Sequence, residues 1–188
     1  MTFGNRRWLI SGGLGSGKSE VRRLLEQSGL HTIDADSVGH SVLAEEARDA
    51  VSARWPQAIS NGEVDRRALA AIVFDDPVEL AALEAITHPL IFGRIETELE
   101  GFEKVAVVEV PLIDTSLGWP SMVVDAPDEV RLQRAVARGM APDDAERRMN
   151  SQPDRAEWLA SSDLVIPNHG TLTELEDTVA ILADYLRT

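Results

Sequence analysis

Residues 12–21, GGLGSGKSEV, place several glycines and two serines around one lysine, just ahead of a helical pattern. Backbone N–H groups can converge on a phosphate only where the chain curls tightly, which glycine allows at little steric cost. The ammonium of Lys18 can reach the β- and γ-phosphates, and the hydroxyl of Ser19 can hold Mg²⁺. The segment fits the P-loop pattern G-x-x-x-x-G-K-[ST] and predicts a site for a nucleoside triphosphate. We expect this site to be formed by Gly12, Gly13, Gly15, Ser16, Gly17, Lys18 and Ser19.

Two carboxylates follow the next apolar stretch, in Asp34-Ala35-Asp36. We expect this second strand to lie beside the first, so that both acids face the phosphates at the carboxyl edge of the sheet. One carboxylate could accept a proton from an attacking hydroxyl while the other helps to hold Mg²⁺. The alternative is that Asp36 is only the N-cap of the following helix.

Short apolar runs alternate with helical patterns along most of the chain. Strands are expected near residues 8–10, 31–33, 105–110, 122–124 and 164–166, with helices between them and a last helix from the capping box at 171–174. This alternation predicts an α/β fold with a parallel sheet flanked by helices. Residues 37–101 are expected to be helical and free of strands, with breaks at Pro56, Asn61-Gly62, Pro77 and Pro89.

Composition excludes several classes of function. The 188 residues carry a net charge of −14 and no cysteine, which argues against nucleic-acid binding and excludes disulfides and thiolate metal sites. No apolar run reaches the roughly 18 residues of a membrane span, and the N-terminal apolar stretch is too short for a signal peptide. We therefore expect a cytoplasmic protein that binds small molecules and neither nucleic acid nor membrane.

A series of segments resembles the dephospho-coenzyme A kinase family in the same order. These segments are GGLGSGKS, IDADSVGHSVL, GEVDRRALAAIVF, LEAITHPLI, VPLI, LQRAVARG, ERRMNSQ and DLVIPNHGTLTEL. The resemblance covers roughly residues 8–185. It implies a P-loop kinase that uses ATP to phosphorylate the ribose 3′-hydroxyl of dephospho-coenzyme A. It further implies one kinase domain over 1–188, with a core at 1–37 and 102–188, an inserted helical acceptor lobe at about 38–101, and a lid at about 139–153.

The resemblance also implies roles for individual residues. Asp36 matches the base that faces the 3′-hydroxyl, and Asp34 matches its partner carboxylate. His88 matches a turn of the acceptor lobe, although it could instead be a helix cap beside Pro89. Arg138 is expected at the ATP, Arg148 in the lid, where Gln152 follows one turn later, and Asn168 near the adenine.

Four features depart from the family pattern. One is His40, which stands where the family often has Arg. Glu20 stands where a Ser or Thr is usual, the segment PLIDTSLGW replaces PLLFE, and Glu109 stands where Asp is usual. The acid of the altered segment is expected to be Asp114. Two alternatives therefore stand beside the main hypothesis: a P-loop kinase of another small hydroxyl substrate, and a nucleotide-binding protein with reduced or lost activity.

Overall fold

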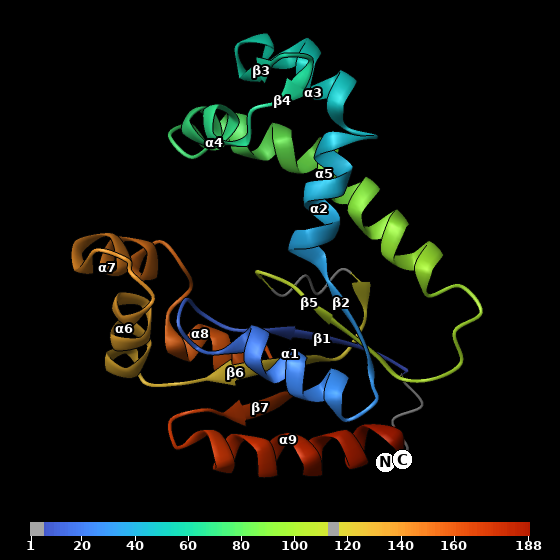
Figure 1. Ribbon diagram of the computed structural model, residues 1–188, viewed down its shortest axis with the longest axis vertical. Coiled ribbons are helices and arrows are strands. Elements are labelled where there is room, and N and C mark those ends of the chain that lie inside the picture. The colour runs from blue at the N-terminus through green and yellow to red at the C-terminus, as the bar shows by residue number, and fades with distance from the viewer. Residues whose placement is uncertain (1–5, 113–116) are drawn as a thin grey trace. The chain divides into compact units, whose positions relative to one another are not determined.

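The computed structural model describes residues 6–112 and 117–188, so Asp114 lies outside the described residues. The chain divides into two compact units (Figure 1). The sheet unit comprises Met1–Asp34 and Glu103–Thr188, and the helical unit comprises Ala35–Phe102. None of the helices in the described part of the chain is long and apolar enough to cross a membrane.

The sheet unit alternates strands and helices, which confirms the predicted α/β class. Its strands are β1 (Arg7–Ser11), β2 (His31–Asp34), β5 (Ala106–Glu109), β6 (Ser121–Asp125) and β7 (Leu164–Pro167). Its helices are α1 (Lys18–Gln27), α6 (Asp128–Ala137), α7 (Pro142–Asn150), α8 (Arg155–Ala160) and α9 (Leu172–Arg187).

The five strands form one parallel sheet in the order β2-β5-β1-β6-β7. The expectation that the second strand lies beside the first is wrong, because β5 is inserted between them. All four residues of β5 are buried, so this strand suits a central position with a neighbour on each side. In the parallel register Glu109 pairs with Asp34 of β2 and with Ile10 of β1. The ends of these three strands therefore meet at one edge.

The core of the sheet unit joins α1 and α9 to the sheet. Val21, Leu24 and Leu25 of α1 recur at helical spacing and are buried against apolar residues of β1 and β6. Figure 1 shows α1 and α9 close together, and they share this core. The capping box predicted at the start of α9 is present, since Thr171 and Glu174 hydrogen-bond to each other's backbone N–H.

The helical unit is formed mainly by helices around its own core, but it is not free of strands. Its elements are α2 (Ala35–Ala44), α3 (Arg48–Arg54), the 3-10 turn η1 (Pro56–Ala58), β3 (Ile59–Ser60), β4 (Glu63–Val64), α4 (Arg66–Val73) and α5 (Pro77–Glu98). Strands β3 and β4 pair antiparallel across Asn61-Gly62, and both turn residues have positive φ. The predicted break in the helical pattern at Asn61-Gly62 is confirmed, but it is the turn of a β-hairpin and not a break between two helices.

Pro89 does not end a helix, contrary to the sequence expectation. It lies inside α5, which begins at Pro77 behind the N-cap Asp76. Proline lacks the N–H that would bond to the carbonyl four residues back, so this helix misses one internal hydrogen bond. Thr87 and Ile95, on either side of Pro89, are buried, and tertiary packing therefore maintains the helix through the proline.

Candidate active site

The loop between β1 and α1 is anchored at both ends by side chains. The hydroxyl of Ser11 donates to the carbonyl of Val110 at 2.9 Å, which fixes the end of β1 against the chain leaving β5. Lys18 is the first residue of α1, and its ammonium donates to the carbonyl of Gly12 at 2.7 Å. This bond crosses the loop from end to end and holds the cation at the helix N-terminus, where phosphates bind.

Close neighbours restrict two loop positions to glycine. Gly17 has φ +98°, and a Cβ there would lie 2.3 Å from Nδ2 of Asn168. A Cβ at Gly13 would lie 2.0 Å from a guanidinium nitrogen of Arg131. A side chain at either position would displace the groups that hold the loop in place.

Arg131 of α6 holds one side of the loop. It is only 5% exposed, and its Nε donates to the carbonyl of Leu14 at 3.0 Å. Gln152, two residues beyond α7, accepts from the N–H of Leu14 at 2.8 Å and from Arg131 at 3.3 Å. Asp128 completes the charge pairing of Arg131 at 2.9 Å. These bonds join α6 and the end of the α7 segment to the loop backbone.

Asn168 and Arg134 hold the second side of the loop. The Asn168 amide is 7% exposed and donates to the carbonyl of Ser16 at 2.7 Å. Arg134 donates to the Asn168 carbonyl at 2.9 Å and to the Ser16 carbonyl at 3.4 Å. Asn168, predicted near the adenine, therefore fixes the loop backbone directly. Arg138 is the C-cap of α6 and is exposed, and the arginine that contacts the loop is its neighbour one turn back.

Carboxylates gather at the ends of β5 and β2, where the predicted metal residues lie. Ser19 donates its hydroxyl to Oε1 of Glu109 at 2.9 Å. Arg22 donates from Nε to Oε2 of the same carboxylate at 2.7 Å and lies 3.5 Å from Oδ2 of Asp34. Ser19, Glu109, Arg22 and Asp34 thus form one chain of contacts, which we call the carboxylate network.

The carboxylate network fits the ligand chemistry of Mg²⁺. This ion is usually held by one or two carboxylates, with phosphate oxygens and water completing its shell. Ser19, Glu109 and Asp34 offer one hydroxyl and two carboxylates at the same sheet edge. Among the residues that the structure describes, no cluster of three acids or histidines could hold a metal by itself. The donor set therefore suits a cation that arrives with phosphates.

Glu20 is neutralised on the surface of α1. Its carboxylate accepts from Arg23 at 3.2 Å and 2.5 Å. This hydrogen bond lowers the pKa of Glu20, with a smaller contribution from the charge of Arg138. The acid that replaces the usual hydroxyl residue is thus paired with a neighbouring arginine.

Helix α7 carries the arginines of the predicted lid. Arg147 forms an ion pair with Asp144 one turn back on the same helix. Arg148 is exposed and has no ion-pair partner within residues 6–112 and 117–188. The two neighbouring arginines therefore differ, since one is paired on the surface and the other presents its guanidinium to solvent.

The remaining predicted residues, Asp36 and His88, lie in the helical unit. Asp36 is exposed in the first turn of α2, and the hypothesis that it is the N-cap is wrong because the helix already begins at Ala35. His88 lies within α5, exposed and edge-on to Phe92 with ring centroids 6.1 Å apart. Its interpretation as a helix cap fails for the same reason.

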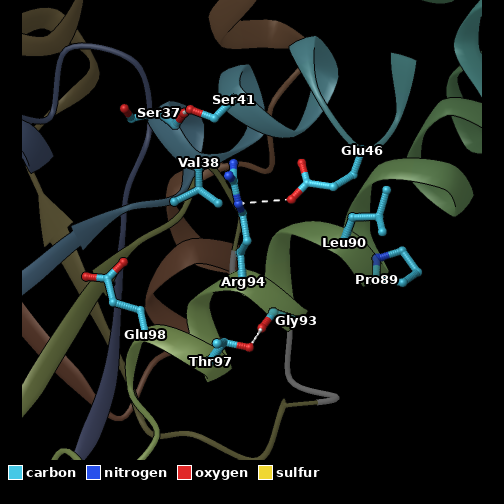
Figure 2. Close-up of a pocket in the computed structure, with 10 residues that line it drawn as sticks. All are labelled: Ser37, Val38, Ser41, Glu46, Pro89, Leu90, Gly93, Arg94, Thr97 and Glu98. Carbon is cyan, nitrogen blue, oxygen red and sulfur yellow. Dashed lines mark hydrogen bonds and ion pairs between the residues drawn. The ribbon is translucent and has the colours of Figure 1, made fainter. Parts of the chain in front are cut away.

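A pocket of about 760 Å³ lies between α2 and α5 in the helical unit (Figure 2). Its lining includes Ser37 and Ser41 of α2 and Gly93 of α5. Arg94 extends into it and is paired with Glu45 at 2.6 Å and with Glu46 at 3.1 Å. The volume is within the usual range of small-molecule sites, and Arg94, the arginine among the described lining residues, is paired with acids.

Several residues that hold the loop or the carboxylate network were not predicted as site residues, among them Arg134, which contacts the loop where Arg138 was expected. Arg131 continues the stripe of Arg134 and Arg138 three residues earlier, so helical spacing could have revealed it. Arg22 follows Lys18 by four residues, on the same helix face. Glu109 was noted only as an acid at the end of a strand, and Gln152 only as a match to the lid.

A glycine-rich loop, a lysine at the following helix start and a carboxylate at the end of a central strand form a site for transferable phosphates. The loop lies at the carboxyl edge of a parallel sheet, where such folds bind ligands. Fold and site together define the class as a P-loop kinase that uses a nucleoside triphosphate.

Comparison with known proteins gives the family. Residues 9–174 match the dephospho-CoA kinase family model. The dephospho-CoA kinase of Streptomyces avermitilis is 40% identical over 90% of this chain and 88% of its own length. A crystal structure from Thermus thermophilus has a TM-score of 0.84 at 34% identity, covering 96% of this chain and 97% of that one. The dephospho-CoA kinase from Campylobacter jejuni, 24% identical with a TM-score of 0.66 and 97% coverage of both chains, has the same fold.

The chain belongs to the dephospho-CoA kinase family. It is accordingly a phosphotransferase of coenzyme A biosynthesis that acts on dephospho-CoA. The resemblance described from the sequence is confirmed.

Proposed function

We propose that this enzyme transfers the γ-phosphoryl group of ATP to the ribose 3′-hydroxyl of dephospho-CoA, with Mg²⁺, in the cytoplasm. The observation that carries the proposal is the loop from Gly12 to Ser19, braced on both sides and joined to Glu109 by the Ser19 hydroxyl. A loop held this firmly presents its donors to phosphate oxygens without rearranging during the reaction.

Lys18 stabilises the charge that develops on the phosphates during transfer. An ammonium has three N–H donors, so the bond to the Gly12 carbonyl does not prevent Lys18 from donating to phosphate oxygens. The N-terminus of α1 adds its dipole, and Gly17 has no side chain with which to cap the first N–H groups. Arg148 contributes a further guanidinium from α7, and Arg138 and Asn168 complete the nucleotide side.

Ser19, Glu109 and Asp34 would hold Mg²⁺, directly or through water. When bound, the ion neutralises charge on the phosphates during transfer. Glu109 is 8% exposed and already oriented by Ser19 and Arg22, so its carboxylate has little freedom to turn away. Position and charge together make Glu109 the principal carboxylate of the metal side.

Asp36 accepts the proton of the ribose hydroxyl as the oxygen attacks the γ-phosphorus. The new P–O bond forms at the 3′-oxygen, the bond to the β-phosphate oxygen breaks, and ADP leaves with the electron pair. Two properties support this role. Asp36 follows the sheet-edge residue Asp34 by only two positions, and it is exposed in the first turn of α2.

The pocket between α2 and α5 takes the pantetheine arm of the acceptor. Dephospho-CoA consists of adenosine, a diphosphate and a neutral arm with two amides. Arg94 is compensated by two glutamates, so the pocket does not favour the diphosphate. Ser37, which lines the pocket, is adjacent in sequence to Asp36, and His88 lies one residue before the lining residue Pro89.

An acceptor screen tests the proposal. Purified protein with ATP and Mg²⁺ is given dephospho-CoA, nucleoside monophosphates or sugar acids, and ADP release is measured while NMR locates the new phosphate. We expect ADP release with dephospho-CoA and phosphate on the 3′-oxygen. Release only with another acceptor, or ATP binding without turnover, would contradict it.

A further inference from the structure

Arg22 occupies an unusual position for a cation, since it binds the carboxylates of the metal side. Its Nε lies 2.7 Å from Oε2 of Glu109, and its terminal nitrogen lies 3.5 Å from Oδ2 of Asp34. The contact with Glu26 is longer, at 4.0 Å, and that acid is largely exposed. Arg22 therefore directs its charge to the two acids at the sheet edge.

The two oxygens of Glu109 face different partners. Oε1 accepts from the Ser19 hydroxyl, and Oε2 accepts from Arg22. A cation at Ser19 thus shares this carboxylate with a guanidinium. The side chain of Arg22 is 23% exposed and that of Glu109 is 10% exposed, so solvent screens their charges less than it would on an open surface.

We infer that Arg22 is an internal counter-cation that weakens metal binding at the carboxylate network and strengthens the binding of metal-free nucleotide. This inference rests on the proposed function of that network. The positive charge of the Arg22 guanidinium repels a divalent cation at Ser19. The same charge attracts the polyphosphate of ATP. Arg22 is a positioning residue, since it acts through Glu109 and Asp34.

The test measures two affinities in each variant, because the inference predicts opposite changes in nucleotide affinity and in metal affinity. Calorimetry with EDTA present gives the affinity for a non-hydrolysable ATP analogue without metal. Electron paramagnetic resonance then gives the affinity of the protein–analogue complex for Mn²⁺. For Arg22→Gln we expect roughly three- to tenfold weaker metal-free analogue binding and roughly three- to tenfold tighter Mn²⁺ binding. Damage to the fold would weaken both.

Two further variants identify the cause. Arg22→Lys keeps the charge but loses the guanidinium fork, and should give both affinities within about twofold of wild type if charge is what matters. Arg23→Gln is the matched control, because the neighbouring arginine is 45% exposed and pairs with Glu20. It should change neither affinity more than about twofold.

The outcomes distinguish the inference from the proposed function. Unchanged or weaker Mn²⁺ binding by Arg22→Gln, with normal binding by wild type, overturns the inference alone. The same tightening in Arg23→Gln overturns it as well, because a general loss of positive charge would then explain the effect. Wild-type protein that binds the analogue but no Mn²⁺ contradicts the metal side of the proposed function, and this inference with it.

Discussion

The sheet unit and the helical unit use polar residues in opposite ways. Seven polar or charged residues are buried in the described part of the chain, and six of them lie in the sheet unit: Ser11, Ser16, Glu109, Ser121, Arg131 and Asn168. The seventh, Thr87, bonds to its own helix at the carbonyl of Leu83. The sheet unit thus fixes its loop with a buried network, whereas the helical unit keeps an apolar core and places its polar groups around an open pocket.

This difference suggests a division of tasks. Buried hydrogen bonds are strong constraints because each unpaired partner would be costly, so these bonds hold the loop backbone in one geometry. Surface side chains around a pocket can adjust to a flexible acceptor. Substitutions in the sheet unit should therefore affect turnover most, and substitutions in the helical pocket should affect acceptor binding. Asp36 tests this division of tasks, because it belongs to the helical unit but is proposed to accept a proton in the chemical step.

The largest expected effect is that of Asp36→Asn. The amide has nearly the shape of the acid but cannot take the hydroxyl proton, and general-base assistance is worth about 10²–10⁴-fold. We expect a fall of kcat in that range, with ATP affinity unchanged, measured by steady-state kinetics and calorimetry. Asp49→Asn, in the first turn of α3, is a matched control that should leave kcat unchanged. A loss below about tenfold would reduce Asp36 to a residue of the helix terminus.

Lys18→Ala should be next in size. Removing one preorganised donor to developing charge typically lowers kcat by about 10²–10³-fold. The alanine variant also loses the bond to the Gly12 carbonyl, so a modest loss of ATP affinity should accompany the fall in kcat. Lys104→Ala, which removes the other lysine of the chain from an exposed position, serves as control. Equal kcat/KM for Lys18→Ala and wild type would exclude this residue from the mechanism.

The Arg147 and Arg148 pair tests whether exposed residues of the sheet unit can also act in catalysis. Arg148 has no ion-pair partner among the described residues, and we expect it to reach the phosphates when the α7 segment closes over them. We expect Arg148→Ala to lower kcat by roughly 10²-fold, on the scale of other transition-state arginines. Arg147→Ala loses only the surface pair with Asp144 and should have little effect. Arg148→Lys should recover activity in part. Similar small losses at both positions would mean that α7 is not a lid.

The sequence was informative where function depends on local patterns. The strand, glycine loop and helix of residues 7–27 follow from spacing and residue type alone, and so does the parallel α/β class. The position of β5 between β2 and β1 depends on pairing between distant segments, and no local signal specifies it. Pro89 was misjudged because the packing of Thr87 and Ile95 outweighs the local preference of proline.

The same distinction holds within the site. Lys18 and Ser19 belong to a contiguous motif, and Asp34 and Asp36 lie at and just after the end of one strand. Arg131 and Gln152 act through contacts with Leu14, more than one hundred positions away in the sequence, so their role appears only when the chain is folded. Residues of short sequence motifs were therefore easier to identify than the residues that hold the loop from distant parts of the chain.

The smallest expected effect is that of substituting Gly93, which tests the role of the pocket in the helical unit. Gly93 lines the pocket, and a Cβ built there meets no atom within 4 Å. A larger side chain should therefore fit without a clash and fill part of the pocket volume that we assign to the acceptor. Replacing glycine inside a helix also favours the helix, so Gly93→Leu should not destabilise the protein. We expect KM for dephospho-CoA to rise about tenfold, roughly 1.4 kcal/mol of binding, with kcat and KM for ATP unchanged. Gly93→Ala should give a smaller rise, and Glu96→Leu, on the same helix but outside the lining, should give none. A fall in kcat with unchanged KM would show that the pocket influences the chemical step and not acceptor binding. The proposed division of tasks, with a fixed phosphate site in the sheet unit and an adaptable acceptor pocket in the helical unit, would then be wrong.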